Sequence, residues 1–120
     1  MTTVMLIAIA IVALLHIAFF VLESILWTKP FGRRTFGLTK ERAADTAQLA
    51  LNQGLYNLFL AAGLIWGLVA RDCAFEIRLF FLACVAVAGI VGGISVKRSI
   101  LFIQAIPAII ALLLLFLTHR

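Results

Sequence analysis

Charged residues are scarce in this sequence. Only 12% of its 120 residues are charged and 65% are hydrophobic, whereas soluble domains are about one-quarter charged. There are five acidic residues against ten basic ones, which leaves a net charge of +5. The composition excludes an ordinary soluble domain and indicates a chain that lies in a lipid bilayer. Without a soluble surface of interleaved basic and aromatic residues, no nucleic-acid partner is predicted.

Cysteine and catalytic groups are also sparse. Cys73 and Cys84 are the only cysteines, and they lack metal-ligand or redox spacing, so both are expected to be unpaired packing residues. No nucleophile is accompanied by a base and an orienting group, and no phosphate loop is present. His16, Glu23 and His119 make no metal site, because His119 is expected at the opposite face of the membrane. The sequence therefore predicts no enzyme, no catalytic residue, no metal and no cofactor.

Long hydrophobic runs dominate the chain. They are continuous and do not alternate with polar residues, which predicts helices instead of barrel strands. About 20 residues are needed to cross a hydrocarbon core of about 30 Å. The predicted spans cover residues 4–27, 46–70, 75–96 and 99–118, with a basic loop at 28–45. Short connections make neighbouring spans antiparallel, so we expect one all-α domain over residues 1–120, an integral membrane up-down four-helix bundle.

Basic residues lie unevenly beside these spans. Five are in the loop at 28–45, and Lys97 and Arg98 lie between spans three and four. The opposite side has only Arg71, Arg78 and Arg120. Because Lys and Arg collect in cytoplasmic loops, both basic loops are predicted in the cytoplasm and both termini outside.

The first loop, TKPFGRRTFGLTKERAADTAQ, carries turn and cap signals. Pro30, Gly32 and Gly37 are expected to break helix continuity. Thr39, followed by Lys40-Glu41-Arg42, is typical of a capped helix start, which would extend span two into the cytosol.

Apolar and basic residues alternate in the same loop. Phe31, Phe36 and Leu38 interleave with the basic residues, a pattern suited to the membrane interface. Two interpretations stay open. The loop is either a solvated connector that obeys the charge rule, or a surface whose Arg33 and Arg34 bind lipid headgroups or a partner.

Hydrogen-bonding side chains interrupt the second span in NQGLYN, residues 52–57. At 1.5 Å per residue, Glu23, Asn52, Gln53 and Gln104 lie about 6 to 10 Å from the cytoplasmic ends of their helices. A charged side chain at membrane depth costs about 2.5 to 3.5 kcal/mol, so Glu23 should face protein or water. We predict an inward-facing polar pocket, with His16 at its floor, lined by Glu23, Asn52, Gln53, Tyr56, Asn57 and Gln104.

A structural interpretation stays open for each of these groups. Amides join transmembrane helices for about 1 kcal/mol per contact. Glu23 could instead reach the interface near Lys29, and His16 could be a satisfied core histidine.

Small residues and one proline suggest how the helices pack. Gly63 and Gly67 in GLIWG, and Gly89 and Gly93 in GIVGG, allow close backbone approach, either within the bundle or at the seam of a homo-oligomer. Pro107 is expected to kink the fourth span and free a carbonyl beside the pocket.

Two stretches, HIAFFVLESILWTKPFGRRTFGL and ALNQGLYNLFLAAGLIWGL, carry a family resemblance. Through the patterns E-x-x-x-W-x-x-P-x-G-R-x-x-F and N-Q-G-x-Y-N, the chain resembles the small four-span bacterial membrane proteins grouped as domain of unknown function 1304. The resemblance covers essentially the whole chain. It implies a four-helix protein of the bacterial inner (cytoplasmic) membrane and no established activity.

Two classes of function remain open. In the first, a small protein binds or transports a polar, cationic or amphipathic ligand that Glu23 exchanges for protons. Compact multidrug exporters share the length, the span count and a first-helix glutamate, but this is an analogy of architecture, and the charge asymmetry argues against their dual insertion. In the second, the chain is a structural or regulatory subunit whose polar residues lock helices together and whose basic loop binds lipid or a partner.

Overall fold

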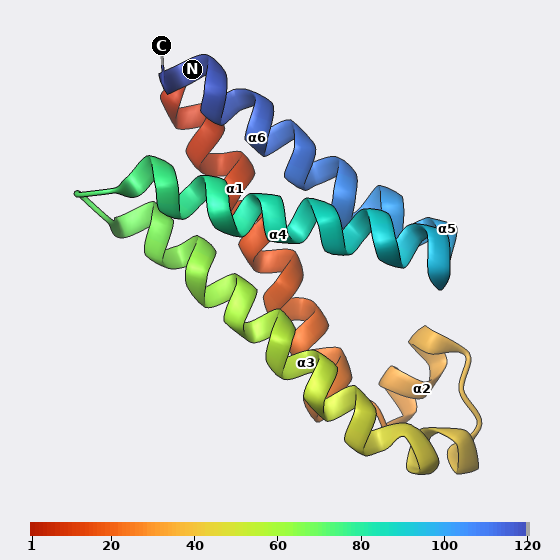
Figure 1. Cartoon of the computed structure of the whole chain (residues 1–120). Coiled ribbons are helices and arrows are strands. Elements are labelled where there is room, and N and C mark those ends of the chain that lie inside the picture. The colour runs from red at the N-terminus through yellow and green to blue at the C-terminus, as the bar shows by residue number, and fades with distance from the viewer. Residues whose placement is uncertain (120) are drawn as a thin grey trace. The chain divides into compact units, whose positions relative to one another are not determined.

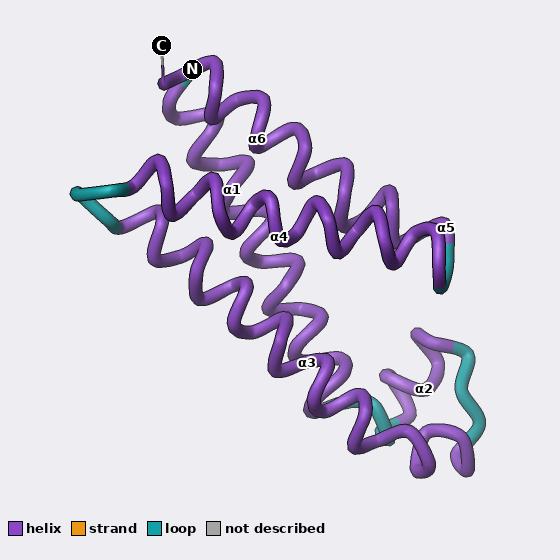
Figure 2. The backbone as a smooth tube through the Cα atoms, viewed as in Figure 1, coloured by secondary structure: helices purple, strands orange, loops and turns teal. Residues whose placement is uncertain are grey.

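The computed structural model describes residues 1–119, which are helical throughout apart from short turns (Figures 1 and 2). No strand occurs in this part of the chain. In order, the elements are α1 (Thr2–Phe20), the π-helix η1 (Val21–Ile25), α2 (Pro30–Phe36), α3 (Lys40–Val69), α4 (Ala74–Ser95), α5 (Arg98–Ile100), the π-helix η2 (Leu101–Ala105) and α6 (Ile106–His119).

Four helical stretches within residues 1–119 are long and apolar enough to cross a membrane. They are Thr2–Ile25, Lys40–Val69, Ala74–Ser95 and Arg98–His119. Each exceeds the roughly 20 residues that a hydrocarbon core requires. The predicted all-α membrane bundle is therefore confirmed.

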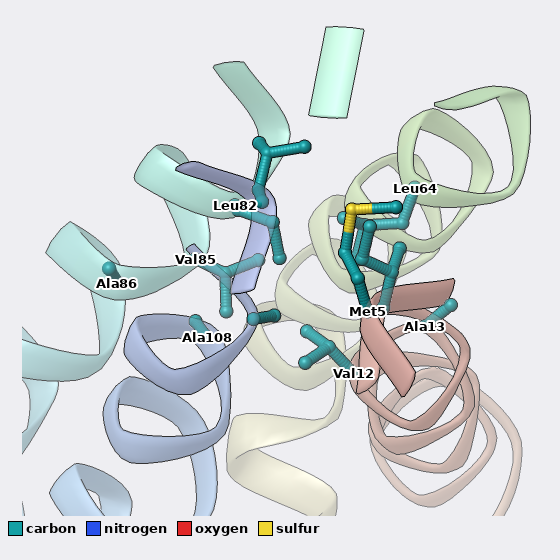
Figure 3. Packing of buried hydrophobic residues seen from close by; sticks show 11 residues of the cluster. Met5, Val12, Ala13, Leu64, Leu82, Val85, Ala86 and Ala108 are labelled. Atoms are coloured by element: carbon teal, nitrogen blue, oxygen red, sulfur yellow. The ribbon is translucent and has the colours of Figure 1, made fainter. Parts of the chain in front are cut away.

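The chain forms two compact units. We call residues 1–15 with the chain from Leu60 onward the bundle unit, and His16–Phe59 the hairpin unit. The core of the bundle unit is aliphatic, with α1 contributing Met5, Ile9 and Val12. Leu64 of α3, Leu82 of α4 and other buried residues complete the core (Figure 3).

Glycines bring the helices of the bundle unit close together. A Cβ atom at Gly63 would overlap the ring of Phe81, and one at Gly89 would overlap the backbone of Ala105. At Gly93 a Cβ would lie 2.8 Å from Leu101 Cβ. These glycines therefore serve contacts within the chain, as the first of the two interpretations predicted.

Two expectations for single residues are wrong. Gly32 does not interrupt a helix but lies buried inside α2, where a Cβ would overlap the carbonyl oxygen of Leu26. Cys73 and Cys84 are unpaired as predicted, but Cys73 is exposed and cannot be a packing residue. Cys73 instead occupies the turn before α4, with a left-handed φ of 55°.

The connection between α2 and α3 follows the turn and cap signals. Gly37 ends α2 in the left-handed region, at φ 63°, where glycine has no steric penalty. Thr39 Oγ1 accepts a hydrogen bond from the backbone N–H of Arg42 at 3.1 Å. This bond confirms the predicted cap and fixes the start of α3 at Lys40.

Candidate functional site

Three hydrogen bonds join the end of the first span to α3 inside the hairpin unit. Asn57 Nδ2 donates to Glu23 Oε1 at 3.3 Å. Ser24 Oγ donates to the carbonyl oxygen of Leu51 at 3.1 Å. Trp27 Nε1 donates to Thr46 Oγ1 at 3.0 Å. Later residues on the first span meet earlier residues on α3, so the two helices are antiparallel. We call these three bonds, two from η1 and one from Trp27 just after it, the η1–α3 contacts.

Small residues on α3 make these contacts possible. Ala43, Ala50 and Asn57 are buried and recur every seven residues, so they lie on one face of the helix. Gly54 lies on the same face and is buried as well. A Cβ atom at Gly54 would overlap Ser24 Oγ. The missing side chain lets the backbones approach, which places Asn57, one turn further on, beside Glu23.

The two carboxyl oxygens of Glu23 have different surroundings. Its Oε1 accepts the bond from Asn57, whereas its Oε2 is buried and has no hydrogen-bond partner among the described residues. A buried unsatisfied acceptor costs about 1 to 3 kcal/mol, and more when the group is charged. Such an atom calls for an explanation, and a ligand or a water that donates to Oε2 would supply one.

The backbone at Glu23 is also unusual. Glu23 lies in η1, where the N–H of Leu26 bonds to the carbonyl of Val21, five residues earlier, at 3.0 Å. Single π-helical turns are rare and are frequent at functional sites. The π-helical turn is therefore a second, independent sign of a functional site at Glu23, beside its buried Oε2.

The other predicted residues of the hairpin unit have different surroundings. Asn52, Gln53 and Tyr56 are exposed, and Tyr56 packs edge-on against Phe59. His16 is fully buried, with its ring edge-on to that of Phe19 at 5.6 Å. The structure thus brings Glu23 and Asn57 into contact, while the wider pocket stays a prediction.

Gln104 belongs to the bundle unit, where it is half-buried in η2. The N–H of Ile106 bonds to the carbonyl of Leu101, and Pro107 follows directly. Proline lacks the N–H that an α-helix needs, so a widened turn before it is a natural accommodation. A π-helical turn that contains Gln104 thus lies directly before Pro107, while the predicted kink and freed carbonyl stay predictions.

Sequence reasoning missed several contact residues. Ser24, Trp27 and Thr46 were not assigned to the site, although they make two of the η1–α3 contacts. Gly54 was overlooked as well. Gly54 lies inside NQGLYN at helical spacing from Ala50 and Asn57, and this spacing could have indicated a face of small residues for close helix packing.

A small cavity in the bundle unit was also not predicted. It has a volume of about 110 Å³, and its lining includes Phe75, Arg78, Thr118 and His119. Arg78 Nε donates to the carbonyl of Gly67 at 2.7 Å, which satisfies one of the last carbonyls of α3. The ring of His119 stacks on Phe75 at 3.8 Å. The bond to Gly67 gives Arg78 a structural role at the end of α3.

The fold and the Glu23–Asn57 pair define a small multi-pass α-helical membrane protein with an acid and an amide joined across two helices. The family described as "Protein of unknown function (DUF1304)" matches residues 10–116, so the chain belongs to the DUF1304 family, as its sequence patterns predicted. No curated protein and no solved structure matches the chain. Membership carries no activity, so function has to be argued from the site itself.

Proposed function

We propose that this protein binds a small cationic or hydrogen-bond-donating ligand at Glu23, as a ligand-binding or transport protein of the membrane. The observation that carries the proposal is Oε2 of Glu23, which is buried and has no hydrogen-bond partner within residues 1–119. Asn57 holds Oε1 and so fixes the orientation of the carboxyl group. An ammonium or similar donor would complete the site through a charge-assisted hydrogen bond.

The surroundings favour a ligand that is partly apolar. Glu23 sits at the end of a strongly apolar span whose other polar side chains after its first turn are His16 and Ser24, so a cation carrying apolar groups matches the site better than a strongly hydrated ion. The exposed Asn52, Gln53 and Tyr56 lie on the turns of α3 before Asn57. We assign them to the polar approach along which such a ligand reaches Glu23.

We further propose that the protein resides in the inner (cytoplasmic) membrane with both basic loops in the cytoplasm. Five basic residues between 28 and 45, with Lys97 and Arg98, support this orientation. Glu23 precedes the first basic loop by only a few residues, so the ligand would enter from the cytoplasmic side.

A second candidate function is structural. The η1–α3 contacts are three cross-helix hydrogen bonds in one small unit, which is the arrangement expected of a helix lock. In this alternative the protein is a structural or regulatory membrane subunit, and Glu23 serves only to hold Asn57.

Ligand binding to the purified protein in lipid nanodiscs distinguishes the two candidates. We use tetraphenylphosphonium, an apolar cation, and dodecylamine, a hydrogen-bond donor, as probes. A probe present at about 100 times its Kd should stabilise the wild type by about 2.7 kcal/mol, seen as a rise in Tm. Glu23→Gln should weaken probe binding at least tenfold, because the carboxylate is lost while the side-chain shape is kept.

Glu41→Gln is the matched control, because it removes an exposed carboxyl group in the first turn of α3. It should leave probe binding unchanged. Equal binding by wild type and Glu23→Gln would reject Glu23 as the site. If neither probe stabilises the wild type while Glu23→Gln lowers Tm, the structural candidate replaces the ligand-binding one.

A further inference from the structure

The short helix α2 presents a basic and aromatic surface immediately after the first membrane span. It begins at Pro30, five residues beyond the last residue of η1. Between residues 28 and 45 there are five basic and two acidic side chains. A helix in this position lies where the span leaves the hydrocarbon and meets the headgroups.

Close contacts fix α2 against the rest of the hairpin unit. Gly32 is buried against the carbonyl of Leu26, at the end of the span. The ring of Phe36 lies 4.9 Å from that of Trp27, which itself bonds to Thr46 of α3. Because α2 is held on one side by these contacts, its opposite side is a defined surface.

That opposite side combines an apolar ring with a cation. Phe31 is 60% exposed although it is a large aromatic residue, and Arg34 is exposed three residues later. Residues at i and i+3 share a helix face. An exposed phenylalanine beside an arginine is the pairing expected where a helix touches both acyl chains and headgroups.

Arg33 supplies an independent observation. Its Nε atom is buried and has no hydrogen-bond partner in the described part of the chain. An unpaired guanidinium N–H is costly, and the group is built to hold phosphate or carboxylate with two parallel hydrogen bonds. An anion that draws this guanidinium toward the exposed side of α2 would remove the penalty.

We propose that the α2 surface binds the phosphate of an anionic phospholipid. Arg33 and Arg34 hold the phosphate, and Phe31 inserts between the acyl chains beside it. A lipid fits better than a soluble anion, because Phe31 would otherwise remain an exposed ring at the edge of the bilayer. This site is separate from Glu23, so the lipid proposal does not depend on whether Glu23 binds a ligand.

Lipid retention measured by native mass spectrometry tests this site. The protein is released from nanodiscs containing equal amounts of dioleoylphosphatidylglycerol and dioleoylphosphatidylcholine. Wild type should retain the anionic lipid preferentially. Arg33→Gln/Arg34→Gln should lose about 25-fold in apparent affinity for it, since each basic residue near a surface contributes about fivefold. Arg34→Gln alone, an exposed change, keeps the test valid if the double variant does not fold.

Four further variants distinguish this site from general charge attraction. Lys97→Gln/Arg98→Gln removes the same charge from the other basic loop and should leave retention near the wild-type value. Arg33→Lys/Arg34→Lys keeps the charge but loses the two-pronged geometry, so its loss should be intermediate. Phe31→Ser should weaken lipid retention severalfold, and Glu23→Gln should not change it.

Several outcomes would overturn the proposal. Equal retention of the two lipids by the wild type would mean that the loop at 28–45 is a solvated connector without a lipid site. An equal loss in Lys97→Gln/Arg98→Gln would show charge attraction without a site. Stabilisation by soluble glycerol phosphate as strong as that by the anionic lipid would show a site for a soluble anion.

Discussion

Gly54 decides whether Asn57 can reach Glu23. In a helix interior, alanine is more favourable than glycine by about 0.5 to 1 kcal/mol. At this position, however, a Cβ would overlap Ser24 Oγ and lie 3.0 Å from the Ser24 backbone nitrogen. Because overpacking costs about 1 to 3 kcal/mol, Gly54→Ala should lower the unfolding free energy and the thermal midpoint in nanodiscs.

A double-mutant cycle can test whether the destabilisation expected for Gly54→Ala comes from the contact with Ser24. Ser24→Ala removes the hydroxyl that the new methyl group would meet, so Gly54→Ala should cost about 1 kcal/mol less in that background. The hydroxyl is also the donor to the Leu51 carbonyl, which gives Ser24→Ala a small cost of its own. A Gly54→Ala protein more stable than the wild type would contradict the close packing described here.

Individual polar residues could be predicted from the sequence only in part. Depth along a helix follows from residue number, which is why Glu23 and Asn57 were identified as intramembrane groups. The direction in which each side chain points depends on which neighbour packs against the helix. For this reason the sequence did not separate buried Asn57 from exposed Asn52 and Tyr56.

At the scale of elements, the π-helical turns η1 and η2 differ in how well the sequence predicts them. Pro107 signals an irregularity before α6, because its missing N–H must be accommodated. The first span has no such residue around Glu23, and its run VLESI reads as ordinary helix. The bond from Leu26 to Val21 becomes visible only in the structure.

The start of α3 rests on a single side chain. Thr39 Oγ1 accepts the hydrogen bond from the N–H of Arg42, so Thr39→Ala should cost about 1 kcal/mol. The loss should be local, because the turns of α3 that follow are held by the η1–α3 contacts. Hydrogen exchange of the amides in the first turn should accelerate about fivefold, which is that free energy expressed as a ratio.

Thr28→Ala is a suitable comparison for the cap, since Thr28 is exposed in the turn after the first span. It should leave exchange in the first turn of α3 unchanged. Unaltered exchange in Thr39→Ala would mean that the cap does not hold this end of the helix.

At the scale of the whole molecule, hydrophobic run length was the dependable signal. The four spans were predicted because lipid leaves the backbone no partner outside its own helix. Helix α3 starts at Lys40 and has 30 residues, about 45 Å, more than the hydrocarbon core needs. Its first turns are polar, so hydropathy marks only the apolar part, whereas the Thr39 cap predicted the longer helix that begins at Lys40.

Orientation across the membrane is a property of the whole chain, and one of its two cysteines, Cys73, can report it. Cys73 is exposed in the turn between α3 and α4, the side predicted to lie outside. In a Cys84→Ala background, a membrane-impermeant maleimide should label Cys73 in intact cells. In a protein whose only cysteine is Arg34→Cys, placed in α2, labelling should require permeabilisation, because Lys and Arg hold that loop on the cytoplasmic side.

The two labelling experiments together distinguish the predicted orientation from the reverse orientation and from insertion in two directions. Labelling of Arg34→Cys but not Cys73 in intact cells would mean the reverse orientation, with ligand entry from outside. Partial labelling of both would mean insertion in two directions, as antiparallel exporter dimers require. Because seven basic residues flank one side and three the other, replacing Lys29, Arg33, Arg34, Lys40 and Arg42 with glutamine should convert single-sided labelling of Cys73 into a mixture.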